Sequence, residues 1–290
     1  MERPQVLQQE DNTVRKRLLS PLMVRIYSAL IMAAFALFLT LNSVESFTGL
    51  IAIAVVAMGW EWGHLVRGKG LDAAFLLQAI AAVAACIAVM LGFPGWSLMV
   101  VLAGTASVFF VRCAADGGGL EARWSATGVS YAGLPAIALI WFRGDDAYGT
   151  LAVIYLFAVV WTTDIAAYFF GRLIGGPKLA RFISPKKTWA GLIGGVLSAA
   201  LAGAVFAYAA GFYALWLGIM ALGFALIAQL GDLGESAVKR IFGKKDSSHL
   251  IPGHGGILDR VDGLVSVAVL AALLVWIIDP AHPGRALLVW

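Results

Sequence analysis

Apolar runs of membrane-spanning length recur along this chain and constrain its fold more than any other feature. Of its 290 residues, 61% are hydrophobic and 13% are charged, and the mean hydropathy is +0.87. A soluble protein of this length could not cover so much apolar side chain. A helix of about 20 apolar residues crosses the ~30 Å hydrocarbon core of a bilayer. The sequence therefore predicts an all-α, polytopic integral membrane protein.

The hydropathy pattern predicts about nine transmembrane helices in one domain. The expected spans lie near residues 23–42, 47–65, 73–93, 96–112, 126–142, 150–170, 188–210, 213–231 and 263–279. We expect a polar N-terminal tail (residues 1–22) followed by one transmembrane domain (23–290). Within this domain, residues 23–149 are expected to form a helical scaffold, and residues 150–279 a catalytic half with polar loops at 171–187 and 232–262. Gly191 and Gly195 have the spacing of small residues that let membrane helices approach closely.

The positive charges alternate between successive connections. All 21 lysines and arginines except Arg143 and Arg285 fall on one side of the expected bundle. The positive-inside rule then places the N-terminus and both polar loops in the cytoplasm and the C-terminus outside. Topology and anionic lipid explain the net charge of +4, so no nucleic-acid partner is expected. No cleavable signal segment precedes the first span, and the compact length favours a bacterial inner membrane.

One carboxylate lies inside an expected span. Asp164 belongs to the segment WTTDIAAYFFGR, residues 161–172. An aspartate at that depth costs several kcal/mol unless it is paired, metal-bound or hydrated. A functional role is the first interpretation, and pairing with an arginine or lysine that fixes helix packing is the alternative.

Two lysines stand at the start of the seventh span. Lys186 and Lys187 lie in the segment ISPKKTWAG, and either Ser184 or Thr188 could cap the helix that follows. A helix N-terminus with adjacent lysines suits a phosphate or an anionic headgroup. The alternative is ordinary flanking charge of the positive-inside kind.

A stripe of charges follows the eighth span. If this segment is helical, Asp232, Glu235, Ser236, Lys239 and Arg240 share one face, because they are spaced i, i+3, i+4, i+7 and i+8. Carboxylates that precede cations suit a metal at one end and phosphate oxygens at the other. The alternative is a stripe of i,i+4 salt bridges such as Glu235 to Lys239.

The segment HLIPGHGGILDRVDG, residues 249–263, ends the second polar loop. Its single proline, Pro252, and its glycines exclude a regular helix and predict exposed backbone N–H groups that could bind an anion. Asp259 and Asp262 then lie one helical turn apart at the mouth of the last span, which is a plausible Mg²⁺ site. His254 is a candidate for phosphate contact or proton transfer, although a lone loop histidine more often only donates a hydrogen bond. Zinc is not expected, because the histidines and cysteines lack a zinc-ligand spacing, and a P-loop is excluded because G-x-x-x-x-G-K-[ST] does not occur.

Residues 236–262 resemble the signature of the phosphatidate cytidylyltransferase family at every charged position. The pattern S-x-φ-K-R-x4-K-D-x-small-x2-φ-P-x-H-G-G-φ-x-D-R-φ-D, with φ apolar, runs from Ser236 to Asp262. The segments W-x-x-D-x-x-A-Y-x-x-G-R, S-P-K-K-T and G-D-L-x-E-S, which begin at Trp161, Ser184 and Gly231, are also similar. The resemblance is strong in the second half. In the first half it consists of hydropathy and of the pair Glu61-Trp62.

The resemblance implies an enzyme that makes CDP-diacylglycerol and pyrophosphate from CTP and phosphatidic acid. It also implies Mg²⁺, with room for a second cation, a cavity open to cytoplasm and lipid, and a homodimer. Two anions must meet, so metal and cations would offset their repulsion and stabilise the transition state. Because the lipid phosphate is largely ionised near neutral pH, positioning and electrostatics can suffice without a strong general base.

Roles for the motif residues follow as hypotheses. We expect the metal at Asp232, Asp259 and Asp262, with Glu235, Asp164 and Asp246 as additional or supporting ligands. Lys239, Arg240, Lys245 and Arg260 would hold the CTP phosphates or the developing pyrophosphate. Lys186 and Lys187, with Ser184 and Thr188 beside them, would hold the lipid phosphate or part of the nucleotide. Ser236 and His254 would position substrate.

Other functions fit less well. A transporter or channel would suit an intramembrane aspartate, but it would be expected to show internal repeats and polar groups along a path through the bilayer. A structural protein would not need aspartates and lysines grouped in this way. The pattern D-G-x2-A-R-x8-G-x3-D-x3-D of CDP-alcohol phosphotransferases is absent, since Asp262-Gly263 is followed by Leu-Val-Ser and Ser266 stands where the pattern requires alanine. A polyprenol kinase or an archaeal-type lipid synthase shares parts of the chemistry and differs in the lipid acceptor.

Overall fold

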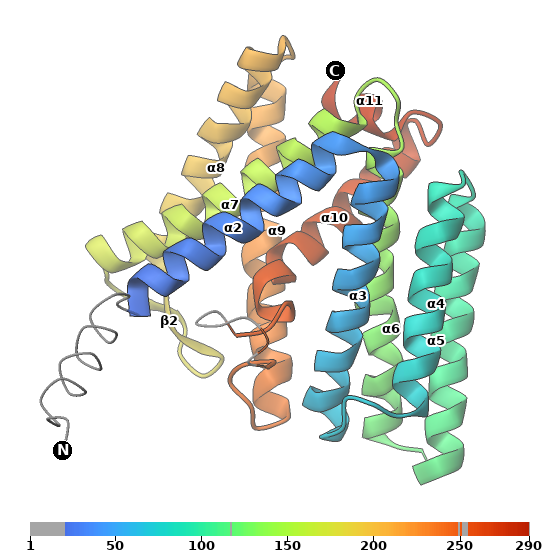
Figure 1. The fold of residues 1–290 in the computed structure, drawn as a ribbon. Coiled ribbons are helices and arrows are strands. Elements are labelled where there is room, and N and C mark those ends of the chain that lie inside the picture. The colour runs from blue at the N-terminus through green and yellow to red at the C-terminus, as the bar shows by residue number, and fades with distance from the viewer. Residues whose placement is uncertain (1–20, 117, 249, 251–254, 290) are drawn as a thin grey trace, which may run out of the picture.

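The structure is a computed structural model that describes residues 21–290 apart from 117, 249, 251–254 and 290. Most of the predicted tail, residues 1–20, and the candidate His254 therefore lie outside the described residues. The described chain is a helical bundle with one β-hairpin (Figure 1). Its helices are α2 (Pro21–Asn42), α3 (Val44–Arg67), α4 (Ala73–Met90), α5 (Pro94–Asp116), α6 (Leu120–Arg143), α7 (Gly149–Leu173), α8 (Trp189–Ala210), α9 (Ala214–Ile241), α10 (Leu258–Ile278) and α11 (Pro283–Leu288).

The all-α polytopic class is confirmed. Among the described residues, eight helices are long and apolar enough to cross a membrane, namely α3 to α10. They coincide with eight of the nine expected spans. The remaining expected span, residues 23–42, coincides with α2, whose apolar stretch Tyr27–Asn42 is shorter.

The helices form two groups, and α10 packs against helices of both. α4 and α5 pack against each other and against α6, and α3 packs on α4 and α6. On the other side of the molecule α8 packs between α7 and α9, while α10 contacts α9, α6 and α7 (Figure 1). In the view of Figure 1, α2 begins in the lower part of the molecule and α11 lies at its upper end. Because eight helices of the described residues meet the length and hydropathy of a span, the ninth crossing through α2 and the cytoplasmic side of the bundle stay predictions.

Several helices extend beyond the spans that hydropathy predicts. α9 continues to Ile241 although its predicted span ends at 231, and α10 begins at Leu258 instead of 263. The reason is physical: hydropathy marks where a helix leaves the hydrocarbon, whereas helical backbone bonds can continue in water. The second predicted polar loop therefore consists of the end of α9, residues 242–257 and the first turn of α10. The first predicted loop contains the antiparallel strands β1 (Lys178–Ala180) and β2 (Ser184–Thr188).

The predicted close approach at Gly191 and Gly195 is present between α7 and α8. A Cβ atom at Gly195 would lie 2.9 Å from the carbonyl oxygen of Thr163, and one at Gly191 would lie 2.7 Å from that of Ala167. These glycines let α8 pack directly on the backbone of α7. The contact holds the end of α7, which carries Asp164, against the start of α8, which follows the lysine pair.

Candidate active site

A charged cavity of about 770 Å³ lies where α7, the β-hairpin, α8, α9 and α10 meet. The acidic side chains that line it are Asp164, Asp232, Asp246, Asp259 and Asp262, and the basic ones are Arg172, Lys178, Lys186, Lys187, Lys239 and Arg260. These residues come from segments that are up to about a hundred positions apart in the sequence. Such a mixture of carboxylates and cations suits a ligand that carries phosphates together with a divalent cation.

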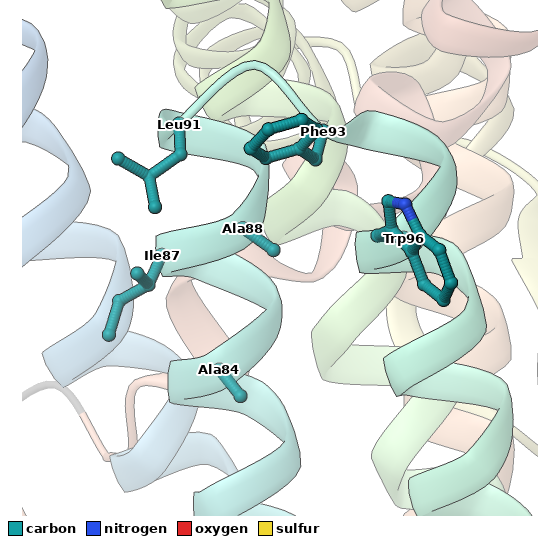
Figure 2. A pocket seen from close by; sticks show the side chains of 6 residues that line it. All are labelled: Ala84, Ile87, Ala88, Leu91, Phe93 and Trp96. Carbon is teal, nitrogen blue, oxygen red and sulfur yellow. The ribbon is translucent and has the colours of Figure 1, made fainter.

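A second hollow has the opposite character. It lies at the turn between α4 and α5 and is lined by Ala84, Ile87, Ala88, Leu91, Phe93 and Trp96 (Figure 2). Figure 2 shows small alanine side chains of α4 across from the aromatic side chains of Phe93 and Trp96. Because this lining offers neither charge nor a catalytic group, the chemistry belongs to the charged cavity.

Lys187 is held in an ion pair, whereas its neighbour Lys186 is exposed. Lys187 Nζ lies 2.7 Å from Asp232 Oδ2 and donates to the carbonyl oxygen of Gln229 at 3.3 Å. The neighbouring Lys186 also lines the cavity, but its side chain is exposed. Thr188, not Ser184, caps α8, because its Oγ1 accepts the backbone N–H of Gly191 at 3.1 Å. Ser184 instead pairs with Ala180 in the hairpin.

Lys239 lines the cavity and connects α9 to α10. Its Nζ lies 2.6 Å from Asp259 Oδ1 on α10 and 3.1 Å from Glu235 Oε2 one turn earlier on α9. Both the predicted helical stripe and its salt-bridge alternative are therefore present, since Glu235 and Lys239 pair at i,i+4. All three side chains are at most 10% exposed. A buried cation that offsets two carboxylates is costly to remove, because each carboxylate would be left without its partner.

Asp259 is already saturated with donors from its own chain. Its Oδ1 accepts Lys239 Nζ, and its Oδ2 accepts the backbone N–H of Gly256 at 2.9 Å and both the N–H, at 3.1 Å, and the hydroxyl, at 2.9 Å, of Ser247. These contacts favour a bracing role for Asp259 over the predicted role as a metal ligand. In the described part of the predicted anion loop, the N–H groups of residues 256–258 thus bind carboxylates of the protein itself, since Glu61 accepts the next two.

Asp262 and Glu235 are the carboxylates that most need a cation. Asp262 interacts electrostatically with the negative charges of Asp232, Glu235 and Asp164. Glu235 Oε1 is buried and finds no hydrogen-bond donor among the described residues. A buried carboxylate oxygen without a donor, beside like charges, fits a bound cation. The described residues hold no group of three Asp, Glu, His or Cys side chains close enough to chelate a metal on their own. A Mg²⁺ here would therefore take substrate phosphates or water as its other ligands.

Asp164 lines the cavity from α7, and its functional role stays a prediction. It interacts electrostatically with the negative charge of Asp232 and with the cations Lys187 and Arg260. The cost of an intramembrane carboxylate is thereby reduced by charges that the sequence places in two other segments.

Several predicted residues stand at the edge of the site. Ser236 Oγ donates to Asp232 Oδ1 at 3.4 Å, a long contact. Arg240 is exposed and donates to the carbonyl oxygens of Ile183 and Lys244, so that it ties the hairpin to the end of α9. Lys245 is exposed and does not line the cavity, whereas its neighbour Asp246 does. Arg240 and Lys245 would need to move before they could touch a ligand in this cavity.

Sequence reasoning missed several residues of the site. Lys178 and Tyr168 line the cavity, and Arg172 donates to the Tyr168 hydroxyl at 2.8 Å. Glu61, from the half expected to be scaffold, is fully buried and hydrogen-bonds to residues next to Asp259. A glutamate within an apolar span was the available signal at Glu61. Its partners could not be read from the sequence, because they lie 186 to 197 residues away.

Comparison with known proteins assigns the chain to a protein family. The model of the cytidylyltransferase family matches residues 23–278. The chain belongs to the cytidylyltransferase family. It is 40% identical over 257 residues to proteins named phosphatidate cytidylyltransferase in Brucella suis biovar 1 and Brucella melitensis biotype 1, covering 88% of this chain and 93% of each relative. A protein of the same name in Staphylococcus haemolyticus is 40% identical over 157 residues, which are 53% of this chain and 59% of the relative.

Membership in the cytidylyltransferase family confirms the resemblance that residues 236–262 carry, and it confirms a membrane-bound nucleotidyltransferase. The matched region extends well beyond that signature, to residue 23. The match therefore includes α3 with Glu61 and the whole first half of the transmembrane domain, residues 23–149.

Proposed function

We propose that this cytidylyltransferase makes CDP-diacylglycerol and pyrophosphate from CTP and phosphatidic acid. The observation that carries the proposal is the cavity in which five aspartates meet six basic side chains. The names of the Brucella relatives support the same substrates. A lipid acceptor fits a site built between helices that are apolar enough to cross a membrane.

In the proposed reaction, a phosphate oxygen of phosphatidic acid attacks the α-phosphorus of CTP. A new P–O bond forms there, the bond to the bridging oxygen between the α- and β-phosphates breaks, and pyrophosphate leaves with the electron pair. The lipid phosphate dianion has no proton to lose, so no general base is required. The basic side chains that line the cavity would hold the phosphates and offset the negative charge that gathers as they approach.

Carboxylates of the set Asp262, Glu235 and Asp232 would hold Mg²⁺ together with substrate phosphates and water, and the ion would supply Lewis-acid stabilisation of the phosphate oxygens. The buried Glu235 Oε1 and the carboxylates around Asp262 support this assignment. Lys187 would keep Asp232 in place through their 2.7 Å ion pair. Lys186 and Arg260 would contact substrate phosphates directly. Mg²⁺ as the cofactor, a second cation, the homodimer and the bacterial inner membrane remain predictions.

The test is a purified preparation in detergent, assayed for pyrophosphate release from CTP with Mg²⁺, with and without phosphatidic acid. The proposal requires release only when lipid and metal are both present, with CDP-diacylglycerol as the co-product. If a folded preparation releases pyrophosphate with another lipid acceptor and not with phosphatidic acid, the substrate assignment is wrong. If no acceptor supports release, the reaction itself is wrong.

A further inference from the structure

Glu61 bridges the two halves of the molecule through four hydrogen bonds. It lies on α3, and its side chain is 0% exposed. Its Oε1 accepts the hydroxyl of Ser248 at 2.6 Å and the backbone N–H of Ile257 at 2.9 Å. Its Oε2 accepts the backbone N–H of Leu258 at 2.8 Å and the hydroxyl of Ser247 at 3.3 Å. One buried carboxylate thus binds Ser247 and Ser248 at the start of the segment that precedes α10, and Ile257 and Leu258 at its end.

These contacts cap α10 from a different helix. The N-cap residue of α10 is Ile257, whose side chain cannot accept a hydrogen bond and so caps no N–H group of the helix. The first N–H groups of a helix lack intrahelical partners and form the positive end of its dipole. The Glu61 carboxylate binds two of these N–H groups and places a negative charge beside them. In this way α3 supplies the cap that the sequence of α10 lacks.

The geometry requires a carboxylate and leaves no room for a larger neighbour. Each oxygen of Glu61 accepts one backbone N–H, and a glutamine would have to turn its NH₂ group toward one of these donors. A Cβ atom at Gly256 would overlap both Glu61 Oε1 and Ser247 Oγ. A second hydrogen bond links α3 to the segment that follows α9: one turn after Glu61, the carbonyl oxygen of His64 accepts Lys244 Nζ.

Ser247 carries the connection from Glu61 to the charged cavity. Its hydroxyl lies within hydrogen-bond distance of both Glu61 Oε2, at 3.3 Å, and Asp259 Oδ2, at 2.9 Å. Asp259 in turn accepts Lys239 Nζ at 2.6 Å. A chain of polar contacts therefore runs from α3 through the loop to α10 and on to α9. The start of α10, which Glu61 fixes, also carries Arg260 and Asp262 into the cavity.

We propose that Glu61 is a positioning residue for cytidylyl transfer: it fixes the start of α10, and with it Asp259, Arg260 and Asp262, relative to Lys239 on α9. Glu61 does not line the cavity and need not touch substrate. The kinetic part of this inference rests on the proposed function. The structural part, which is the capping of α10 by α3, does not depend on it.

The test compares Glu61→Gln with Glu121→Gln in the same purified background. Glu121 is the matched control, because it is also a glutamate of the first half but pairs with Arg112 on α5 at 2.5 Å. Amide hydrogen exchange is measured at residues 256–258, and kcat and KM for CTP are measured with saturating lipid. In Glu61→Gln we expect exchange at Ile257 and Leu258 to be about tenfold faster or more, because their acceptors are weakened. We expect kcat to fall by about a hundredfold, since small misplacements of catalytic groups cost that much.

The outcomes separate a positioning role from a merely structural one. A loss of thermal stability with kcat per folded molecule and exchange at residues 256–258 both unchanged would overturn the proposal, as would equal effects in Glu121→Gln. The exchange measurement needs no turnover. If the wild type makes no CDP-diacylglycerol, the proposed function fails, while the capping of α10 is still decided by exchange.

A milder variant keeps the proposal testable if Glu61→Gln does not fold. Ser248→Ala removes one of the four donors and keeps the carboxylate. It should accelerate exchange at residues 256–258 and lower kcat to a smaller extent than loss of the carboxylate. Unchanged exchange and unchanged kcat in Ser248→Ala would contradict the network through Glu61.

Discussion

Lys239 Nζ on α9 lies 2.6 Å from Asp259 Oδ1 on α10, so that one ammonium group joins the two helices that bound the charged cavity. The same ammonium also lies 3.1 Å from Glu235 Oε2. Because all three groups are largely buried, their charges are balanced mainly by one another. The arrangement couples the stability of the fold to the electrostatics of the site.

Replacing Lys239 with methionine should destabilise the protein and abolish activity. Removing one member of a buried ion pair costs about 3–5 kcal/mol, because the remaining charges are left without compensation. Thermal unfolding in detergent measures the loss of stability. Lys245→Met is the control, since Lys245 is exposed and should change the melting temperature little. Equal melting temperatures for the two variants would contradict the buried network.

Asp262→Asn should lower kcat by about a hundredfold at saturating Mg²⁺. Asp262 interacts with three other carboxylates, and the neutral amide would remove the charge that we expect to bind the metal. The half-saturating Mg²⁺ concentration should also rise. Turnover is measured by pyrophosphate release across a Mg²⁺ titration. A folded Asp262→Asn variant that turns over like the wild type would rule out this role.

Lys187→Met should reduce kcat/KM more than Lys186→Met. Lys187 is held by Asp232 and by the Gln229 carbonyl, whereas the Lys186 side chain is exposed. Loss of Lys187 removes a pre-positioned cation and also leaves Asp232 without its 2.7 Å partner. We expect losses of about a hundredfold and about tenfold, respectively, from the general cost of misplaced or missing transition-state charge. The two adjacent lysines serve as controls for each other, and equal losses would mean that the ion pair with Asp232 is unimportant.

Gly195→Ala should destabilise the contact between α7 and α8. Its Cβ would lie 2.9 Å from the backbone carbonyl oxygen of Thr163, so the helices must separate. Such overpacking costs about 1–3 kcal/mol. Gly223→Ala is the matched control on α9, because a Cβ at Gly223 meets no atom within 4 Å. Thermal unfolding of the two variants compares them, and equal stability would show that α8 tolerates a displacement.

Asp72 should make stability depend on pH. Burial raises the pKa of Asp72, but the Phe75 N–H and the Arg67 guanidinium outweigh this and hold it below the usual aspartate value of 3.8. A group whose pKa is lowered by folding adds stability above its unfolded pKa, and this stability is lost as the pH falls through the folded pKa. Asp72→Asn keeps a good helix cap but removes the charge that pairs with Arg67 at 2.7 Å.

The Asp72→Asn variant should therefore be less stable than the wild type near neutral pH. The difference should shrink below pH 4, because the wild-type carboxyl then becomes neutral as well. Thermal unfolding of both proteins between pH 3 and pH 7 measures this trend. A difference that stays constant over the whole range would show that the charge of Asp72 does not matter.

Local patterns were sufficient for the class and for much of the site. Apolar runs predict the spans, because a span of hydrocarbon demands about 20 apolar residues wherever it occurs. Helical spacing placed Asp232, Glu235 and Lys239 on one face, and the structure confirms the Glu235–Lys239 pair. The signature of residues 236–262 identified the family, which the match to residues 23–278 confirms. These inferences need only the chemistry of neighbouring residues.

Tertiary structure alone decided which charged groups meet. The sequence offers Asp259 and Asp262 as equivalent ligands one turn apart, but folding surrounds Asp259 with four donors and leaves Asp262 among carboxylates. Likewise, Glu61 is a lone acid in an apolar run until α3 packs against the start of α10. Burial makes every such partner decisive, because an unpaired charge in a low-dielectric interior costs several kcal/mol. The partners themselves are set by packing between segments far apart in the chain, which no local pattern records.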